Sequence, residues 1–314
     1  MSRSRQRTMN EATAKRIVHH AVAITEPRWR TYAVSWSRID SVFLERGYEQ
    51  QGFRCARLVQ ALEKHGVASI GALGSILDER ASRARYDNKY AKGTDAPFYA
   101  QLRDGRFGEN GRLFDEAVRA FLERDPGSGG RFFWMYLWSM LRACHYLREK
   151  HGSSFATYLL SEYRRFAGKA DLAPTNFLAI TGPEWREFLV RVKPWKPLPG
   201  IGVNVFDFIM GDVIEARFND DSYKFDSANQ YFLEVTGISA LIAPFERERV
   251  IEFLRSLRLP YTLREVNKGI YTYCSDTEAE NFGFCRSLRR CQECAVADLC
   301  EKRLGSPRVK RPDC

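Results

Sequence analysis

The sequence lacks a hydrophobic stretch long enough to cross a membrane, and it lacks an apolar signal core near its start. Its most apolar run covers residues 132–141, which is much shorter than the roughly 20 residues that a transmembrane helix needs. The basic segment at residues 1–16 is not followed by an apolar stretch. We therefore expect a cytoplasmic protein without an export signal or a membrane partner.

Regular alternation of apolar and polar residues, which would indicate strands, is also missing, and no internal repeat is evident. Apolar residues recur at helical spacing through most of the 314 residues. A chain of this length can form two domains or one elaborated domain. The pattern predicts an all-α protein. We expect three regions: a helical N-terminal region at 1–105, a helical domain at 106–240 and C-terminal helices at 241–314. The first region is expected to pack partly against the last, and it suits a role in substrate specificity or in partner binding.

The charge balance is basic, because 49 lysines and arginines face 39 aspartates and glutamates, a net charge of +10. Such an excess indicates a polyanionic partner such as nucleic acid, although basic surfaces also serve solubility alone. Residues 78–110 are rich in arginine and tyrosine and are broken by glycine and proline. This segment could contact a nucleic acid, but a solvated surface is the more common role of such a charge run.

A proline and two glycines form a turn at residues 198–202, Leu-Pro-Gly-Ile-Gly. Proline lacks an N–H group and glycine tolerates positive φ, so this segment does not fit inside a helix. Apolar residues recur at helical spacing behind it, which predicts a helix that begins just after Gly202. A glycine turn that leads into a helix N-terminus presents backbone N–H groups and the positive end of the helix dipole to a phosphate. A simple turn between two core helices has the same pattern.

Four of the eight cysteines lie close together with the spacing C-x5-C-x2-C-x5-C; they are Cys285, Cys291, Cys294 and Cys300. In a chain without an export signal, metal ligation explains clustered cysteines better than disulfides do. A [4Fe–4S] cluster and a structural zinc ion both take four cysteine thiolates. Zinc ribbons usually pair two C-x2-C knuckles, and this loop has one, which favours the iron–sulfur cluster.

The other four cysteines carry weaker signals. Cys274 lies eleven residues before Cys285 and is an alternative ligand. Cys55 and Cys144 stand among apolar residues and are expected to be buried. Cys314 ends a basic tail and has no evident partner.

The turn, an aspartate that follows it and the cysteine loop together resemble the helix-hairpin-helix DNA glycosylase superfamily, in particular its endonuclease III branch with a C-terminal iron–sulfur cluster loop. The resembling segments are Leu198–Gly202, Phe225–Gly237 and Cys285–Glu301. The family loop usually reads C-x6-C-x2-C-x5-C, one residue longer between the first two ligands. The resemblance covers residues 185–304, extends to about 106 only by the expected helix count, and does not include the first hundred residues. It implies a two-lobed helical glycosylase fold and a monomer that binds double-stranded DNA, a nucleoid-associated protein.

The resemblance also implies a mechanism. The hairpin holds the DNA backbone beside the target nucleotide, which is flipped into a pocket between two helical domains. Asp226 corresponds to the catalytic aspartate, which stabilises the oxocarbenium character of the sugar as the base departs. The same residue is well placed to cap the helix that follows. Where bifunctional members carry a lysine that forms a Schiff base, this chain has Asn204, which cannot form that imine. A monofunctional enzyme that leaves an abasic site is therefore implied.

The resemblance assigns further residues to DNA. The hairpin residues Leu198, Gly200, Ile201 and Gly202 are expected to contact the DNA backbone, and Asn204 to hydrogen-bond a phosphate or the attacking water. The cluster is expected to brace a basic loop whose arginines, among them Arg289 and Arg290, hold phosphates.

Two features of the family are not evident, namely the glutamine-containing patch that wedges into the base stack and the glutamate of the purine-specific branch. The apolar helix at 131–148 stands where the wedge is expected, and its Trp134, Trp138 and His145 could fill the gap, although core packing is the simpler role. Two alternatives remain: a non-catalytic DNA-binding protein on the same scaffold, and a redox protein unrelated to DNA.

Overall fold

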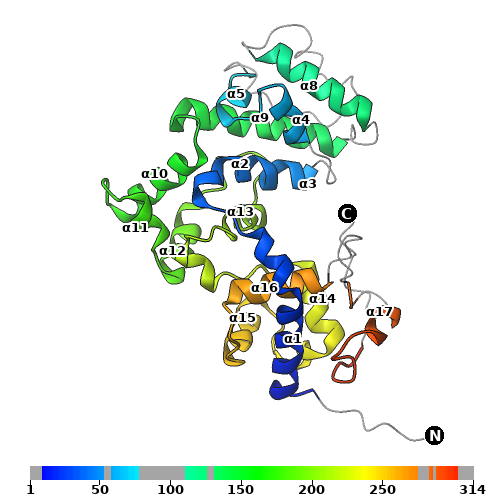
Figure 1. The fold of residues 1–314 in the computed structure, drawn as a ribbon. Helices are drawn as coiled ribbons and strands as arrows, with labels where there is room; N and C mark the ends of the chain where they lie inside the picture. The colour runs from blue at the N-terminus through cyan, green and yellow to red at the C-terminus, as the bar shows by residue number, and fades with distance from the viewer. Residues whose placement is uncertain are drawn as a thin grey trace, which may run out of the picture. The chain divides into compact units, whose positions relative to one another are not determined.

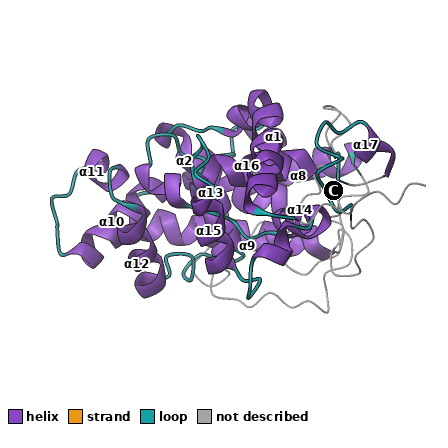
Figure 2. Ribbon diagram, turned by 90° about the horizontal axis from the view of Figure 1, so that it is seen from below, coloured by secondary structure: helices purple, strands orange, loops and turns teal. Residues whose placement is uncertain are grey.

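The computed structural model describes residues 9–52, 58–77, 110–125, 131–274, 283–285 and 288–302. Within these ranges the all-α prediction is confirmed, since they contain helices and turns and no strand (Figure 2). Strand-like pairing there is limited to an isolated parallel bridge between Val34 and Val213. No helix in the described part of the chain is both long and apolar enough to span a membrane.

The chain divides into two compact units. The terminal unit combines Met1–Ala33 with Asn219–Asp313, and the central unit covers Val34–Phe218. This division differs from the sequence-based boundaries near residues 105 and 240. The difference arises because the first helix packs against a helix more than two hundred residues later in the chain, so that only the start of the predicted N-terminal region joins the C-terminal segment.

The central unit has α9 (Arg131–His151) at the centre of its core. Trp134, Trp138 and Cys144 on this helix are buried, so the tryptophans are core residues, and the predicted burial of Cys144 is confirmed. Helix α5 (Ile70–Gly74) packs so closely on α9 that a Cβ at Gly74 would lie 2.6 Å from the Cys144 carbonyl oxygen. The remaining elements are η2 (Trp36–Arg38), α2 (Ile39–Leu44), the π-helix η3 (Glu45–Glu49), α3 (Gln50–Gly52), α4 (Leu58–Lys64), α8 (Gly111–Arg124), α10 (Phe155–Ala167), α11 (Pro174–Leu178), α12 (Gly182–Val192) and α13 (Val203–Met210); η7 (Arg217–Asp221) spans the boundary between the units.

The terminal unit is organised around α1 (Glu11–Trp29) and α16 (Leu263–Cys274), which lie side by side (Figure 1). Gly269 permits this approach, because a Cβ there would lie 2.7 Å from the Val22 Cα atom. The hydroxyl of Thr25 donates mainly to the Ala21 carbonyl at 2.7 Å and also lies 3.3 Å from the Gly269 carbonyl oxygen. The other elements are η1 (Arg30–Tyr32), α14 (Ser227–Thr236), η8 (Ile238–Leu241), α15 (Arg247–Ser256) and α17 (Leu288–Gln292).

Candidate functional site

The glycine turn of the central unit has the predicted form. Gly200 has φ +81°, and a Cβ at this position would lie 2.9 Å from the Ser139 Cβ atom and 3.3 Å from Tyr48 Cε1. Both the backbone conformation and the space therefore require glycine. Helix α13 begins at Val203 with Gly202 as its N-cap, so the predicted helix start is confirmed.

The four turn residues assigned to DNA differ in exposure. Leu198 and Ile201 are 1% and 6% exposed, so their side chains anchor the turn in the core and leave only backbone groups for a ligand. Gly200 and Gly202 are exposed, and a Cβ at Gly202 would meet no atom within 4 Å. The exposed face of the turn is therefore bare backbone.

The N-terminus of α13 is available to an anion. The first intrahelical bond joins the Phe206 N–H to the Gly202 carbonyl at 2.9 Å, and no side chain caps this end. The N–H groups of Val203, Asn204 and Val205 precede that bond, so they have no acceptor within the helix. Val203 and Asn204 are exposed. This end of the helix can therefore bind a phosphate through backbone donors.

The π-helix η3 supports the turn, a feature that the sequence did not predict. The buried Tyr48 hydroxyl donates to the Pro199 carbonyl at 2.8 Å, and burial raises the pKa of Tyr48 well above its usual value, which keeps it protonated as a donor. Arg46 Nη1 lies 2.6 Å from Asp212 Oδ2 and donates to the Phe208 carbonyl at 3.0 Å. These bonds attach the turn and α13 to η3.

In the terminal unit, Asp226 is the N-cap of α14, as the sequence predicts. Its Oδ1 atom accepts from the Asn229 backbone N–H at 2.9 Å and from Asn229 Nδ2 at 3.0 Å. Within the described residues, Oδ2 has no hydrogen-bond partner, and the side chain is half-buried. The carboxylate is thus fixed by one oxygen, and the other is available to a ligand.

Two buried residues that the sequence did not single out orient this carboxylate. The Tyr223 hydroxyl donates to Asn229 Oδ1 at 3.0 Å, and both residues are fully buried. Burial, with the charge of Asp226 as a smaller cause, raises the pKa of Tyr223 well above its usual value, so the phenol remains a donor. Because Tyr223 engages the amide oxygen, the amide nitrogen of Asn229 must face Asp226.

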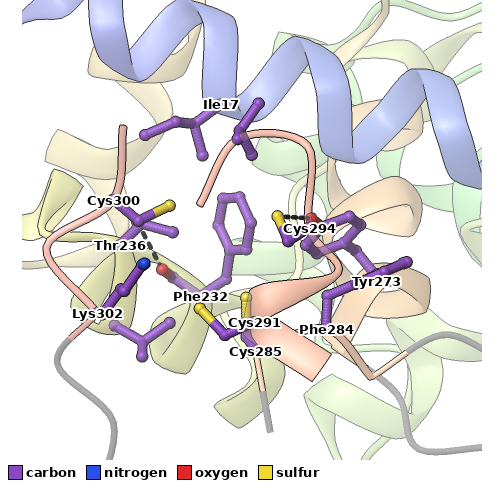
Figure 3. A pocket seen from close by; sticks show the side chains of 12 residues that line it. Ile17, Phe232, Thr236, Tyr273, Phe284, Cys285, Cys291, Cys294, Cys300 and Lys302 are labelled. Atoms are coloured by element: carbon purple, nitrogen blue, oxygen red, sulfur yellow. Dashed lines mark hydrogen bonds between the residues drawn. The ribbon is translucent and has the colours of Figure 1, made fainter. Parts of the chain in front are cut away.

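The four predicted metal ligands line one pocket in the terminal unit, which is partly open to solvent (Figure 3). Apart from the cysteines, the lining is mainly apolar and aromatic; it consists of Ile17, Phe232, Val235, Thr236, Tyr273, Phe284, Val296 and Lys302. Burial raises the pKa values of the Cys291 and Cys300 thiols. A cation in the pocket would favour their thiolate forms. Cys274 is buried but does not line this pocket.

The four sulfur atoms are spread around the pocket and do not gather at one point (Figure 3). In the described part of the chain, no group of three or more His, Cys, Asp or Glu side chains is arranged to hold a metal ion. Around one zinc ion, with Zn–S bonds of about 2.3 Å, sulfur atoms lie no more than about 4.6 Å apart. In a four-iron cluster each thiolate binds a different iron, so the sulfurs surround a larger core.

The cysteine loop also carries the two arginines expected at phosphates. Arg290 Nη1 lies 2.8 Å from Glu293 Oε2, and its guanidinium lies 4.9 Å from the centre of the Phe284 ring. Arg290 is therefore held within the loop. The side chain of Arg289 lies outside the described residues, as do Cys55, Cys314 and most of the segment 78–110.

The hairpin belongs to the central unit, whereas Asp226 and the cysteine pocket belong to the terminal unit. A comparison of the chain with models of known protein families, with curated proteins and with solved structures finds no match.

Proposed function

We propose that the protein is a monofunctional DNA glycosylase that hydrolyses the N-glycosidic bond of a flipped damaged, mismatched or modified base. The observation that carries the proposal is the carboxylate of Asp226, which is fixed through Oδ1 by Asn229, with Oδ2 unengaged within the described residues. Stabilising a sugar with oxocarbenium character requires a negative charge that is already oriented before the reaction.

The proposed reaction consumes one water molecule. As the bond from C1′ to the base nitrogen breaks, the electron pair leaves with the base and positive charge develops on the sugar. Asp226 stabilises this charge and orients a water, whose oxygen bonds to C1′. The water gives one proton to the departing base, its remaining hydroxyl becomes the C1′ hydroxyl of the sugar, and the DNA strand remains intact at an abasic site.

The glycine turn is proposed to hold the DNA backbone. Gly202 admits close approach, and no side chain caps the N-terminus of α13. Lys193 and Lys196 are exposed just before the turn and add positive charge. A neutral amide at Asn204, exposed in the first turn, can bind a phosphate but cannot form a Schiff base, which supports hydrolysis without strand cleavage.

We propose that Cys285, Cys291, Cys294 and Cys300 hold a [4Fe–4S] cluster. All four side chains line the same pocket, and their C-x5-C-x2-C-x5-C spacing, with one C-x2-C knuckle where zinc ribbons pair two, favours the cluster over a structural zinc ion. When bound, the cluster would cross-link residues 285–300 to one another, and side chains of α14 and α16 would pack around it, since both helices contribute to the pocket lining.

The test is base release from a panel of duplexes that carry damaged, mismatched and naturally modified bases, scored by mass spectrometry and by alkali-labile sites. We expect Asp226→Asn to abolish release of whichever base the wild type excises. Asparagine caps helices as well as aspartate does, so this variant should remain folded. Asp221→Asn, which removes an exposed carboxylate paired with Arg255 at 3.0 Å in the same unit, is the matched control and should retain activity.

Unchanged base release by Asp226→Asn would refute the assignment of this residue. Tight, salt-sensitive DNA binding without base release from any duplex would instead support a non-catalytic DNA-binding protein. Little affinity for DNA, together with reversible reduction by a protein partner, would support a redox protein.

A further inference from the structure

The cysteine pocket contains a polar group that the proposed function does not use, the hydroxyl of Tyr273. It lies 2.8 Å from Cys294 Sγ, and Tyr273 is 1% exposed (Figure 3). Tyr273 stands in the last turn of α16, next to a pocket whose other lining is mostly apolar.

Three aromatic neighbours hold the Tyr273 ring. Phe284 stacks on it at 4.9 Å between ring centres and 26° between planes. Phe232 and His20 approach it edge-on, each at 6.0 Å. The hydroxyl can therefore not swing away from Cys294 without disrupting these contacts. Its position is set by packing and does not depend on the hydrogen bond alone.

The direction of the hydrogen bond follows from the state of the sulfur. Either atom can be the donor while Cys294 is a thiol. A cysteine that binds a metal is a thiolate, which can only accept. In the metal-bound state the Tyr273 phenol must therefore donate to Cys294.

We propose that Tyr273 is a positioning residue for the metal centre, which fixes the Cys294 thiolate and sets the reduction potential of the cluster; this inference rests on the proposed [4Fe–4S] cluster. A hydrogen bond to a ligand sulfur draws negative charge away from the centre. It therefore stabilises the reduced, more negative state and raises the potential. It also keeps the Cys294 side chain in its ligating position.

The test uses Tyr273→Phe, which removes the hydroxyl and retains the ring. The full chain is purified without oxygen, its iron and sulfide are measured, and its reduction potential is followed by visible absorption. We expect the variant to show a more negative potential and a several-fold faster loss of absorbance to an iron chelator. Tyr158→Phe is the matched control: Tyr158 is also buried and donates to the Pro194 carbonyl at 2.5 Å in the central unit, so both quantities should remain at wild-type values.

A second measurement covers the case in which Tyr273→Phe does not retain iron. The iron–thiolate stretching bands of the wild type should shift in D₂O, because deuterium replaces the hydrogen that Cys294 accepts; unmoved bands would refute the proposal. Tyr273→Phe protein with full iron content, a wild-type reduction potential and a wild-type rate of absorbance loss would also refute the proposed role of Tyr273. The assignment of the cluster would not be affected. Zinc or no metal in the wild-type protein would overturn both the role of Tyr273 and the cluster assignment. If the protein binds iron and Tyr273→Phe shows the expected shift in reduction potential, but the wild type releases no base, only the proposed glycosylase activity would be refuted.

Discussion

At the scale of single residues, the two glycines of the turn have different reasons to be there. Gly200 has φ +81° and lacks room for a Cβ, whereas Gly202 has φ −99° and open space around it. We therefore expect Gly200→Ala to destabilise the protein by about 1–3 kcal/mol through strain and overlap. Gly202→Ala should cost less than about 1 kcal/mol, the loss of a good N-cap residue. Chemical denaturation measures both values.

Gly202→Ala should affect DNA affinity more than it affects stability. A methyl group there would stand on the exposed face that we propose for the phosphate, so Gly202→Ala should weaken duplex binding although the protein remains folded. Fluorescence anisotropy at fixed salt would measure this. Equal affinity for Gly202→Ala and the wild type would show that the backbone of the turn does not contact DNA.

Asn229 provides a second prediction at this scale. It connects Tyr223 to Asp226 through its side-chain amide, with both bonds at 3.0 Å. Asn229→Ala would remove the side-chain support of the carboxylate and leave the buried Tyr223 hydroxyl without its acceptor, a cost of about 1–3 kcal/mol in stability. If Asn229 orients the catalytic group, single-turnover kinetics should show a lower rate of base release and unchanged DNA affinity. A loss of stability without any change in rate would mean a purely structural role.

At the scale of elements, the turn depends on a neighbour that is distant in sequence. The Arg46–Asp212 pair connects η3 to the residue two positions beyond α13, and the two side chains are 9% and 4% exposed. Arg46→Met should cost about 3–5 kcal/mol, since it leaves the Asp212 charge buried without its partner. The double variant Arg46→Met with Asp212→Leu should recover much of that loss. A double-mutant cycle by urea denaturation measures the coupling, and additive losses would contradict it.

This support also marks the limit of what the sequence could predict. The start of α13 after Gly202 and the cap of α14 at Asp226 were predictable because both signals act within four residues. The four cysteines were grouped in one site because they lie within a short loop. The roles of Tyr48 and Arg46 were not predictable, since each acts on residues more than 150 positions away. The helical periodicity around Tyr48 and Arg46 does not distinguish a residue that only packs in the core from one that also hydrogen-bonds a distant segment.

At the scale of the whole molecule, the two ends of the described chain build one unit. Helix α1 packs along α16, and Ile17 of α1 lines the cysteine pocket beside residues of α14. The N-terminal segment is therefore part of the proposed metal centre. We expected from the sequence that the first region packs partly against the last, but the close contact between α1 and α16 at Gly269 appears only in three dimensions.

The last prediction follows from this arrangement. A chain that lacks residues 1–33 would expose the face of α16 that α1 covers and would open the pocket at Ile17. We expect it to lose the proposed iron–sulfur cluster and to unfold its terminal unit at lower temperature than the full chain. Residues 34–218, produced alone, should fold with helical circular dichroism and cooperative unfolding, because they form a compact unit with their own core. Iron content and thermal melts of the two truncated chains measure this. Full iron retention without residues 1–33 would show that α1 is dispensable for the metal centre.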